Sequence, residues 1–237
     1  MLRIENGLYR HGAFSLQIAL DVPASSLTAV LGPSGAGKST LLNVIAGFEK
    51  LETGRVIIDG TDVTAQPPAT RAVSMVFQDN NVFPHLTLWQ NVALGVSPSL
   101  TLSDAQKQSV YDALARVGLF QLASRKPGDV SGGERQRVAL ARVLVRRANV
   151  LLLDEPFAAL DPGLRAEMLH LVREISEAQK LATLLVTHQP EEIRGAVDGI
   201  IFLAQGKVQN FNTQDFFTSK LPSVRSYLGS DTKATKD

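Results

Sequence analysis

The residues with the clearest chemistry form a glycine-rich loop that fits the phosphate-binding pattern G-x-x-x-x-G-K-S/T. The loop consists of Gly32, Pro33, Ser34, Gly35, Ala36, Gly37, Lys38, Ser39 and Thr40. Glycines suit a backbone that curls its N–H groups around phosphate oxygens, because a Cβ would disfavour the positive φ angles involved. Lys38 would reach the outer phosphates, and the Ser39 hydroxyl would bind Mg²⁺. The alternative is a glycine-rich turn that matches by chance, but the loop also separates an apolar run from a helical segment. The motif therefore predicts a nucleoside triphosphate site.

A pair of carboxylates follows the apolar run that begins at Val150. In phosphate-loop NTPases an Asp at this place, here Asp154, holds the Mg²⁺ of the nucleotide. The end of such a strand lies beside the phosphate loop, because ligands of parallel sheets bind beyond the carboxyl ends of the strands. Glu155 should face another side, since neighbouring residues on a strand alternate. It could orient or deprotonate a water, or it could merely cap the next turn.

A third motif is Ser131-Gly132-Gly133-Glu134. Ser131 and Glu134 have the spacing of a capping box, so one interpretation is a well-started helix. Two glycines in the first turn cost roughly 1 kcal/mol each relative to alanine, so helix stability alone does not explain them. A helix start without side chains is an anion site that a phosphate could approach end-on.

Composition narrows the function classes. The 237 residues, of which 44% are hydrophobic, can form one large domain with a core. The 24 basic and 23 acidic residues leave a net charge of +1, which gives no electrostatic reason to expect a nucleic-acid partner. With no cysteine, disulfides and thiolate metal sites are excluded. Several arginines follow Glu134, and we expect them to form a solvated helix face rather than a nucleic-acid stripe. They are Arg135, Arg137, Arg142, Arg146 and Arg147.

Membrane-spanning and targeting segments are not expected. The first residues contain no apolar run typical of a signal peptide. The longest apolar runs, such as Val150 to Leu153 and Leu181 to Val186, fall far short of the ~20 residues that cross a bilayer. Any role at a membrane should therefore depend on a partner protein.

The order of the expected elements predicts an α/β fold. Short β-rich runs dominate the first part of the chain, and one helix interrupts them, from Lys38 to about Phe48. The runs are Leu2 to Asn6, Phe14 to Asp21, Leu27 to Leu31, Arg55 to Asp59 and Val73 to Phe77. The middle of the chain reads as helices, at Leu88 to Leu94, Ser103 to Val117 and Gly132 to Arg147.

From Val150 onward, buried strands alternate with helices, which is typical of a parallel sheet. Strands are expected at Val150 to Asp154, Leu181 to Thr187 and Gly199 to Leu203. Helices are expected to open at Asp161-Pro162 and at Pro190. We expect one domain over residues 1–228, with a helical insertion at about 79–148, and a disordered tail over 229–237.

The motifs together resemble those of the ATP-binding cassette (ABC) ATPases in order and approximate spacing, over nearly the whole chain. They are the glycine-rich loop, Gln78, Ser131-Gly132-Gly133-Glu134, Asp154-Glu155, Leu160-Asp161 and Thr187-His188. Val130 stands where the family usually has leucine, and Ala158 where many members have serine. The resemblance implies a mainly parallel core sheet, an antiparallel β subdomain and an inserted helical subdomain.

The resemblance also implies roles for single residues. Tyr9 is similar to the aromatic residue that stacks on adenine, with a core tyrosine as the alternative, and Glu155 is similar to the catalytic base. His188 resembles the switch histidine that contacts the γ-phosphate. Gln78 resembles the glutamine that contacts Mg²⁺ and the attacking water, so Ser39, Gln78 and Asp154 would hold the metal. The other histidines, His11, His85 and His170, match no motif and are expected at the surface.

In this family the segment Ser131 to Glu134 acts in trans, on ATP bound to a second subunit, and Asp161 belongs to the segment that communicates between subunits. The resemblance thus implies ATP, Mg²⁺ and a homodimer. It further implies a transmembrane permease, an extracytoplasmic solute-binding protein and a place on the cytoplasmic face of the inner membrane.

Two segments, residues 77–87 and 156–165, most resemble the ATPases of bacterial thiamine importers. We therefore expect an importer ATPase for thiamine or a derivative. The alternatives are another small solute, such as an inorganic anion or a polyamine, and a DNA-associated ABC ATPase. The last class places a long coiled coil between the two glycine-rich motifs, and this sequence has no heptad run there.

Overall fold

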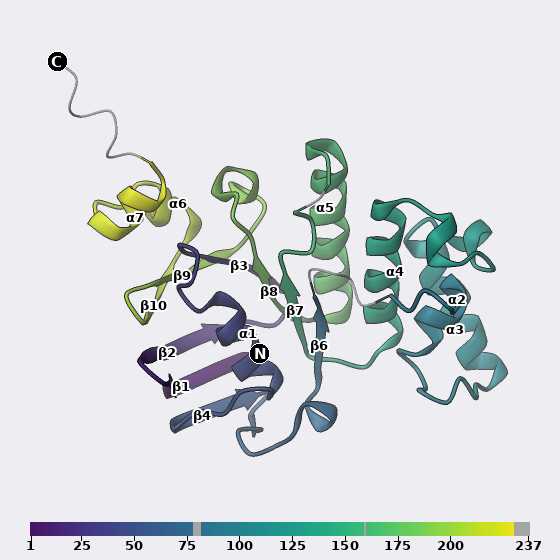
Figure 1. Cartoon of the computed structure of the whole chain (residues 1–237), viewed down its shortest axis with the longest axis horizontal. Coiled ribbons are helices and arrows are strands. Elements are labelled where there is room, and N and C mark those ends of the chain that lie inside the picture. The colour runs from purple at the N-terminus through teal and green to yellow at the C-terminus, as the bar shows by residue number, and fades with distance from the viewer. Residues whose placement is uncertain (78–81, 159, 230–237) are drawn as a thin grey trace.

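The structure, a computed structural model, describes residues 1–77, 82–158 and 160–229. Within these residues the strands form a single sheet in the order β5-β4-β1-β2-β10-β9-β3-β8-β7-β6 (Figure 1). The strands are β1 Leu2–His11, β2 Phe14–Val22, β3 Ser26–Leu31, β4 Thr53–Ile58, β5 Thr61–Asp62, β6 Val73–Val76, β7 Val150–Asp154, β8 Ala182–Val186, β9 Gly199–Ala204 and β10 Lys207–Phe211. The α-helices are α1 Lys38–Ala46, α2 Leu88–Ala93, α3 Asp104–Arg116, α4 Gly132–Val145, α5 Pro162–Gln179, α6 Thr213–Phe217 and α7 Pro222–Tyr227.

The sheet has a parallel part and an antiparallel part. Strands β6, β7, β8, β3 and β9 pair in parallel, whereas β1, β2, β4 and β5 form an antiparallel group. The hairpin partner of β9, strand β10, joins the two parts by pairing with β2 at Lys207 and Gln17. The predicted mainly parallel core with an antiparallel β segment is therefore confirmed.

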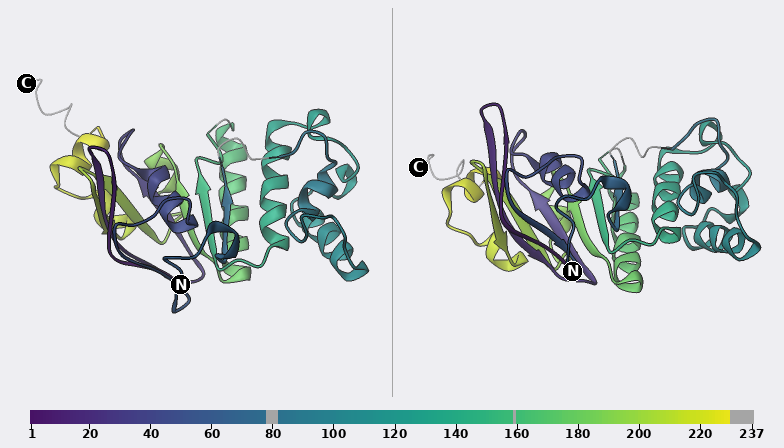
Figure 2. Two further views of the ribbon diagram at one scale, coloured as in Figure 1. Left: turned by 60° about the horizontal axis from the view of Figure 1, so that its bottom comes forward. Right: turned by 90° about the horizontal axis from the view of Figure 1, so that it is seen from below.

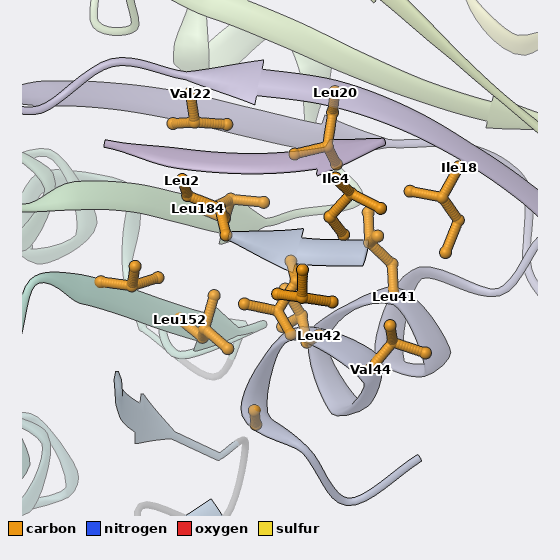
Figure 3. Packing of buried hydrophobic residues seen from close by; sticks show 14 of the residues in the cluster. Leu2, Ile4, Ile18, Leu20, Val22, Leu41, Leu42, Val44, Leu152 and Leu184 are labelled. Atoms are coloured by element: carbon orange, nitrogen blue, oxygen red, sulfur yellow. The ribbon is translucent and has the colours of Figure 1, made fainter. Parts of the chain in front are cut away.

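Each central strand is apolar on both faces because it separates two hydrophobic layers. On one face, Leu152 of β7 and Leu184 of β8 pack with α1 and the antiparallel strands, as Figure 3 shows for Leu41 and Leu42 among these residues. The residues next in sequence point the other way, so Leu153 and its neighbours pack against α5. The parallel part of the sheet is thus covered on both sides, whereas β2 of the antiparallel part alternates buried and exposed residues. Helix α1 packs with both parts.

The helices α2, α3 and α4 form a separate hydrophobic cluster. They fall between β6 and β7 in the chain and lie together at the end of the molecule opposite α6 and α7 (Figures 1 and 2). Each begins with a complete capping box, at Thr87, Ser103 and Ser131 respectively. The expected capping box of Ser131 and Glu134 is confirmed. The domain boundaries at 1–228 and 79–148 remain predictions.

The expectation of a solvated arginine face was wrong for Arg142. Its Nε donates a hydrogen bond to the Asn91 carbonyl at 3.0 Å and its guanidinium donates to Asn91 Oδ1 at 3.0 Å. Burial lowers the pKa of Arg142. The side chain joins α4 to α2 because the two helices bury polar atoms that must be paired.

Two other expectations need correction. The segment that opens at Pro190 is not an α-helix but a short 3₁₀ helix, Pro190–Ile193, and it ends before Gly195, whose φ of 79° interrupts helical geometry. Sequence patterning also missed β10, whose burial is only partial. Most of the tail expected at 229–237 lies outside the described residues. Within the described part of the chain, no helix has both the length and the hydrophobicity needed to cross a membrane.

A buried cation holds the end of α1. Arg71 is only 4% exposed, and its N–H groups donate to four backbone carbonyls. The acceptors are the carbonyl oxygens of Val44 and Ile45 at 2.8 Å, and of Thr64 and Gln66 at 3.0 Å. The last carbonyls of a helix have no partner within it, so Arg71 supplies one from outside and places its charge at the negative end of the helix dipole.

We expect Arg71→Met to lower the free energy of unfolding by roughly 3 kcal/mol, because it leaves buried carbonyls unpaired. Urea denaturation without nucleotide measures the change. Arg55→Met is the matched control: Arg55 is 61% exposed in its pair with Glu5, and such pairs contribute about 1 kcal/mol or less. Equal losses in the two variants would contradict the capping role of Arg71.

Candidate functional site

The glycine-rich loop joins the end of β3 to the start of α1, and three glycines shape it. Gly32, Gly35 and Gly37 have φ angles of 149°, 76° and 98°, a region that side chains rarely adopt. A Cβ on Gly32 would lie 2.3 Å from the carbonyl oxygen of Leu203 in β9, and a Cβ on Gly37 would lie 2.7 Å from the ring of Phe14. Gly35 has open space around it, so only its backbone conformation requires glycine.

The Lys38 side chain lies inside this loop and bonds to its backbone. The side chain is 6% exposed, and Nζ donates hydrogen bonds to the carbonyls of Gly32 at 2.8 Å and Pro33 at 3.0 Å. Burial lowers the pKa of Lys38, while the carboxylates of Glu155 and Asp154 oppose that shift. An ammonium group has three N–H donors, so two can hold the loop while the third contacts a phosphate.

Ser39 and Asp154 come together at the start of α1. The Asp154 carboxylate accepts a hydrogen bond from the Ser39 side chain. Burial raises the pKa of Asp154, and the Ser39 hydrogen bond and the charge of Lys38 partly offset that rise. A hydroxyl beside a carboxylate is the kind of oxygen donor set that Mg²⁺ uses together with nucleotide phosphates. These residues therefore fit Mg²⁺ bound with a nucleotide.

Glu155 contacts a different partner from Asp154. Its carboxylate Oε1 lies 2.5 Å from Nε2 of His188, and the two side chains are 22% and 46% exposed. The backbone of Glu155 has a φ of 48°, unusual for a residue with a side chain, and its N–H donates to the Val186 carbonyl at 3.2 Å. The chain turns sharply here, which directs Glu155 toward the segment after β8.

A cavity of about 470 Å³ lies over the loop, large enough for a small ligand. Its wall includes Lys38, Ser39, Glu155 and His188 as well as the β1–β2 hairpin. The hairpin residues in the wall are Tyr9, His11 and Phe14. His11 is exposed, as expected, but sequence reasoning placed neither His11 nor Phe14 at the cavity. Strand alternation could have identified His11, because residues two apart in a strand share a face.

Tyr9 combines the two alternatives considered for it. It is 5% exposed, belongs to the core, and its ring lies 6.2 Å from that of Phe14. Burial raises the pKa of Tyr9, as does the hydrogen bond between its hydroxyl and Glu49. Since it also lines the cavity, only a small part of the ring can meet a ligand.

The segment Ser131 to Glu134 starts α4 and does not belong to the wall of this cavity. Ser131 N–H donates to Glu134 Oε2 at 2.7 Å, and Glu134 N–H donates to Ser131 Oγ at 3.2 Å. A Cβ on Gly133 would lie 2.6 Å from Leu164 of α5, so this glycine permits close helix packing. Gly132 is exposed with space beside it, and packing does not explain it.

The other predicted site residues that the structure describes lie on the loop or at the start of α5. Asp161 is exposed at the start of α5, where no hydrogen bond from its side chain caps the helix. Pro33 and Ser34 are exposed on the loop, and Ala36 and Thr40 are half-buried. Gln78 lies outside the described residues.

Comparisons with known proteins agree with this geometry. The sequence profile of the ABC transporter family matches residues 16–158. Two similar relatives are both called thiamine import ATP-binding protein ThiQ. One, from Ruegeria sp. (strain TM1040), is 48% identical and covers 97% of this chain and 100% of its own length. The other, from Mesorhizobium japonicum, is 49% identical, with shares of 96% and 91%.

Solved structures show the same fold. An ATP-binding cassette of an ABC transporter in its ADP conformation superposes with a TM-score of 0.87 at 26% identity, over 97% of this chain and 98% of its own. The protein cbiO1 from Clostridium perfringens, part of the ABC transporter complex cbiONQ, gives 0.82 at 28% identity, over 92% and 91%. This chain therefore belongs to the ABC transporter family, whose ATP-binding subunits bind ATP with Mg²⁺ and hydrolyse it.

Proposed function

We propose that this chain is the ATP-hydrolysing subunit of an importer that carries thiamine or a derivative across a membrane. The observation that carries the enzymatic part is the grouping of Lys38, Ser39 and the Glu155–His188 pair around one cavity. A phosphate-binding loop alone would suit a nucleotide sensor. A carboxylate beside it, held by a histidine, adds a group that can accept a proton from water.

Each side chain has a distinct task in this proposal. Lys38 binds and orients the outer phosphates, and Ser39 and Asp154 hold Mg²⁺, which supplies charge neutralisation on the phosphates when it is bound. Glu155 accepts a proton from the attacking water. His188 holds the Glu155 carboxylate through Nε2 and contacts the γ-phosphate. Gln78 would complete the metal and water contacts.

Tyr9 supports the adenine base through the small part of its ring that lines the cavity. Base stacking on an aromatic ring contributes about 1 to 3 kcal/mol when the faces meet fully. Because Tyr9 is 5% exposed, a smaller contribution is expected here, with His11 and Phe14 completing the wall.

We infer that Ser131 and the backbone of the following residues serve the nucleotide of a second copy. Ser131 is exposed, and its Oγ accepts a bond from Glu134, so the hydroxyl hydrogen can point outward to a phosphate. Gly132 leaves the helix start open to an anion. A homodimer thus completes two sites, with Asp161 in the segment between them. The dimer closes when ATP is bound, because only ATP offers a γ-phosphate to Lys38, Ser131 and His188, and it opens when hydrolysis removes those contacts.

The transport part of the proposal is supported by two relatives that are named thiamine import ATP-binding protein. The similarity extends over nearly their full length. The partners would be a transmembrane permease and an extracytoplasmic solute-binding protein, with this chain on the cytoplasmic face of the inner membrane. An inorganic anion or a polyamine is the alternative solute. Nucleic acid is not a proposed partner, since the net charge is +1.

Transport is tested by isolating the chain with its membrane partner and reconstituting both in liposomes. We expect ATP-dependent uptake of radiolabelled thiamine in the presence of the solute-binding protein. Unlabelled thiamine should compete, whereas a polyamine or an inorganic anion should not. Uptake of one of those solutes instead would reject the thiamine assignment while leaving the ATPase role intact.

Glu155→Gln separates chemistry from binding. The substitution keeps the size of the side chain but removes the proton acceptor, and loss of a positioned base slows such steps by roughly 10² to 10⁴. ATP affinity should remain, and the variant should accumulate as an ATP-bound dimer with Mg²⁺. Phosphate release, calorimetry and light scattering measure the three quantities.

Glu167→Gln, on the exposed side of α5, is the matched control and should hydrolyse ATP normally. Lys38→Ala should lose ATP binding instead. Near-native phosphate release by Glu155→Gln would remove this residue from the role of base.

Ser131→Arg tests action in trans. A bulky cation at the exposed start of α4 should block ATP-dependent dimerisation while ATP binding by the monomer is unchanged. Dimerisation is best followed in a Glu155→Gln background. Ser103→Arg is the matched control because Ser103 is also an exposed N-cap with a capping box, and loss of either cap should destabilise by about 1 kcal/mol. Weaker ATP binding by the Ser131→Arg monomer, or dimerisation equal to that of the control, would contradict the trans role.

A further inference from the structure

One arginine links the two segments that flank the Glu155–His188 pair. Arg165 lies in the first turn of α5, and its guanidinium donates to the Leu160 carbonyl at 2.7 Å. The same guanidinium hydrogen-bonds the Gln189 side chain and forms an ion pair with Glu192. Leu160 directly precedes Asp161, and Gln189 directly follows His188. A single side chain therefore joins the start of α5 to the segment that carries the histidine.

The surroundings of Arg165 make this link strong. The side chain is 14% exposed and that of Glu192 is 32% exposed, so solvent screens the pair far less than it screens a surface pair. Guanidinium presents five N–H donors in a planar fork, which lets one residue serve several acceptors with fixed directions. Its acceptors come from two segments of the chain, the Leu160 carbonyl before α5 and the side chains of Gln189 and Glu192 after β8. Arg165 connects these two segments.

The segment after β8 has few other restraints of this kind. The Thr187 N–H donates to the Val30 carbonyl at 3.4 Å, and Thr187 Oγ1 accepts from the Gln189 N–H at 3.2 Å. Further along, Ile193 is buried in the core. The segment lies over a cavity of about 490 Å³, whose wall contains Arg165 and Glu192 as well as Glu155 and His188. With a cavity beneath this segment, side chains that cross the space, such as Arg165, help to hold it in place.

We propose that Arg165 is a positioning residue for ATP hydrolysis: by clamping Gln189 and Glu192 to the start of α5, it sets His188 at the distance and angle at which it holds Glu155. This inference rests on the proposed hydrolytic function and names a residue outside the motifs that suggested it. Because the start of α5 also follows Asp161, the clamp ties the histidine to the segment proposed to face a second subunit.

The same helix carries a matched structural anchor. Arg173 lies about two turns further along α5 and also binds three groups, with a hydrogen bond to the Ala196 carbonyl at 3.1 Å and ion pairs to Glu177 at 3.1 Å and Asp198 at 2.9 Å. It fastens α5 to the chain before β9 and lines the same cavity, but its partners are not adjacent to His188 in the chain. Removing either arginine should reduce stability, but only the loss of Arg165 should disturb the reacting groups.

The test is steady-state ATP hydrolysis by Arg165→Met and Arg173→Met with the stability of each variant measured in parallel. We expect Arg165→Met to lower kcat roughly tenfold to hundredfold, with the KM for MgATP within about twofold, because misplacement of a supporting group acts on turnover. Arg173→Met should keep kcat near the native value despite a comparable loss of stability. Equal kcat in the two variants, or a change confined to KM, would overturn the proposal.

A double-mutant cycle supplies a second measurement, which remains informative if Arg165→Met folds poorly. Glu192→Gln leaves the arginine in place and should lower kcat in the same direction. The double variant should turn over no more slowly than Arg165→Met alone, since both changes break one clamp. Additive effects would overturn the proposal. If Arg165→Met matches the native enzyme while Glu155→Gln is inactive, only the positioning role fails, whereas native turnover by Glu155→Gln would reject the hydrolytic function itself.

Discussion

The pairing register of β3, β8 and β7 is the constraint on which the whole site depends. Val30 of β3 and Asp154 of β7 both align with Val186 of β8. The glycine-rich loop, the two carboxylates and His188 therefore all lie at the carboxyl ends of these parallel strands. A shift of one residue would turn every side chain of a strand to the opposite face. Here it would separate His188 from Glu155 and move leucines from one hydrophobic layer into the other, so the register that builds the core also builds the site.

Charge is concentrated at this edge in groups that are partly removed from water. Burial disfavours the charged forms of both Lys38 and Asp154, and each charge partly compensates for the other. Glu155 adds a backbone conformation that is rarely adopted by residues with side chains. Such features are unfavourable for folding by themselves and are tolerated where the surrounding strands fix them. A bound ligand that carries several negative charges, together with a divalent cation, would place opposite charges beside Lys38 and Asp154 and so compensate for their burial.

Sequence patterns predicted the parallel strands, the capped helices and the glycine-rich loop, because each depends on local periodicity or on residues adjacent in the chain. They failed where contacts between distant segments decide the outcome. Phe14 reaches the cavity through the β1–β2 hairpin, and the half-buried Arg142 bonds to Asn91 of α2, so neither role is visible in local sequence. The segment at Pro190 has a helix-start signal but forms only a short 3₁₀ helix that ends at Ile193, before Gly195. Ser131 and Glu134 do form the expected box, yet only the structure separates Gly133, which packs on Leu164, from Gly132, which does not.

The capping of α1 by Arg71 bears on how the protein behaves at high ionic strength. Dissolved ions weaken attractions between opposite charges that face water, such as Arg3 and Asp21, which are 44% and 48% exposed. Arg71 instead binds uncharged carbonyls in a buried place, where mobile ions have little access. The helix that carries Lys38 at its first position is thus held by an anchor that salt does not screen. Concentrated electrolyte should loosen the outer ion pairs of the β1–β2 hairpin well before it alters the shape of the glycine-rich loop.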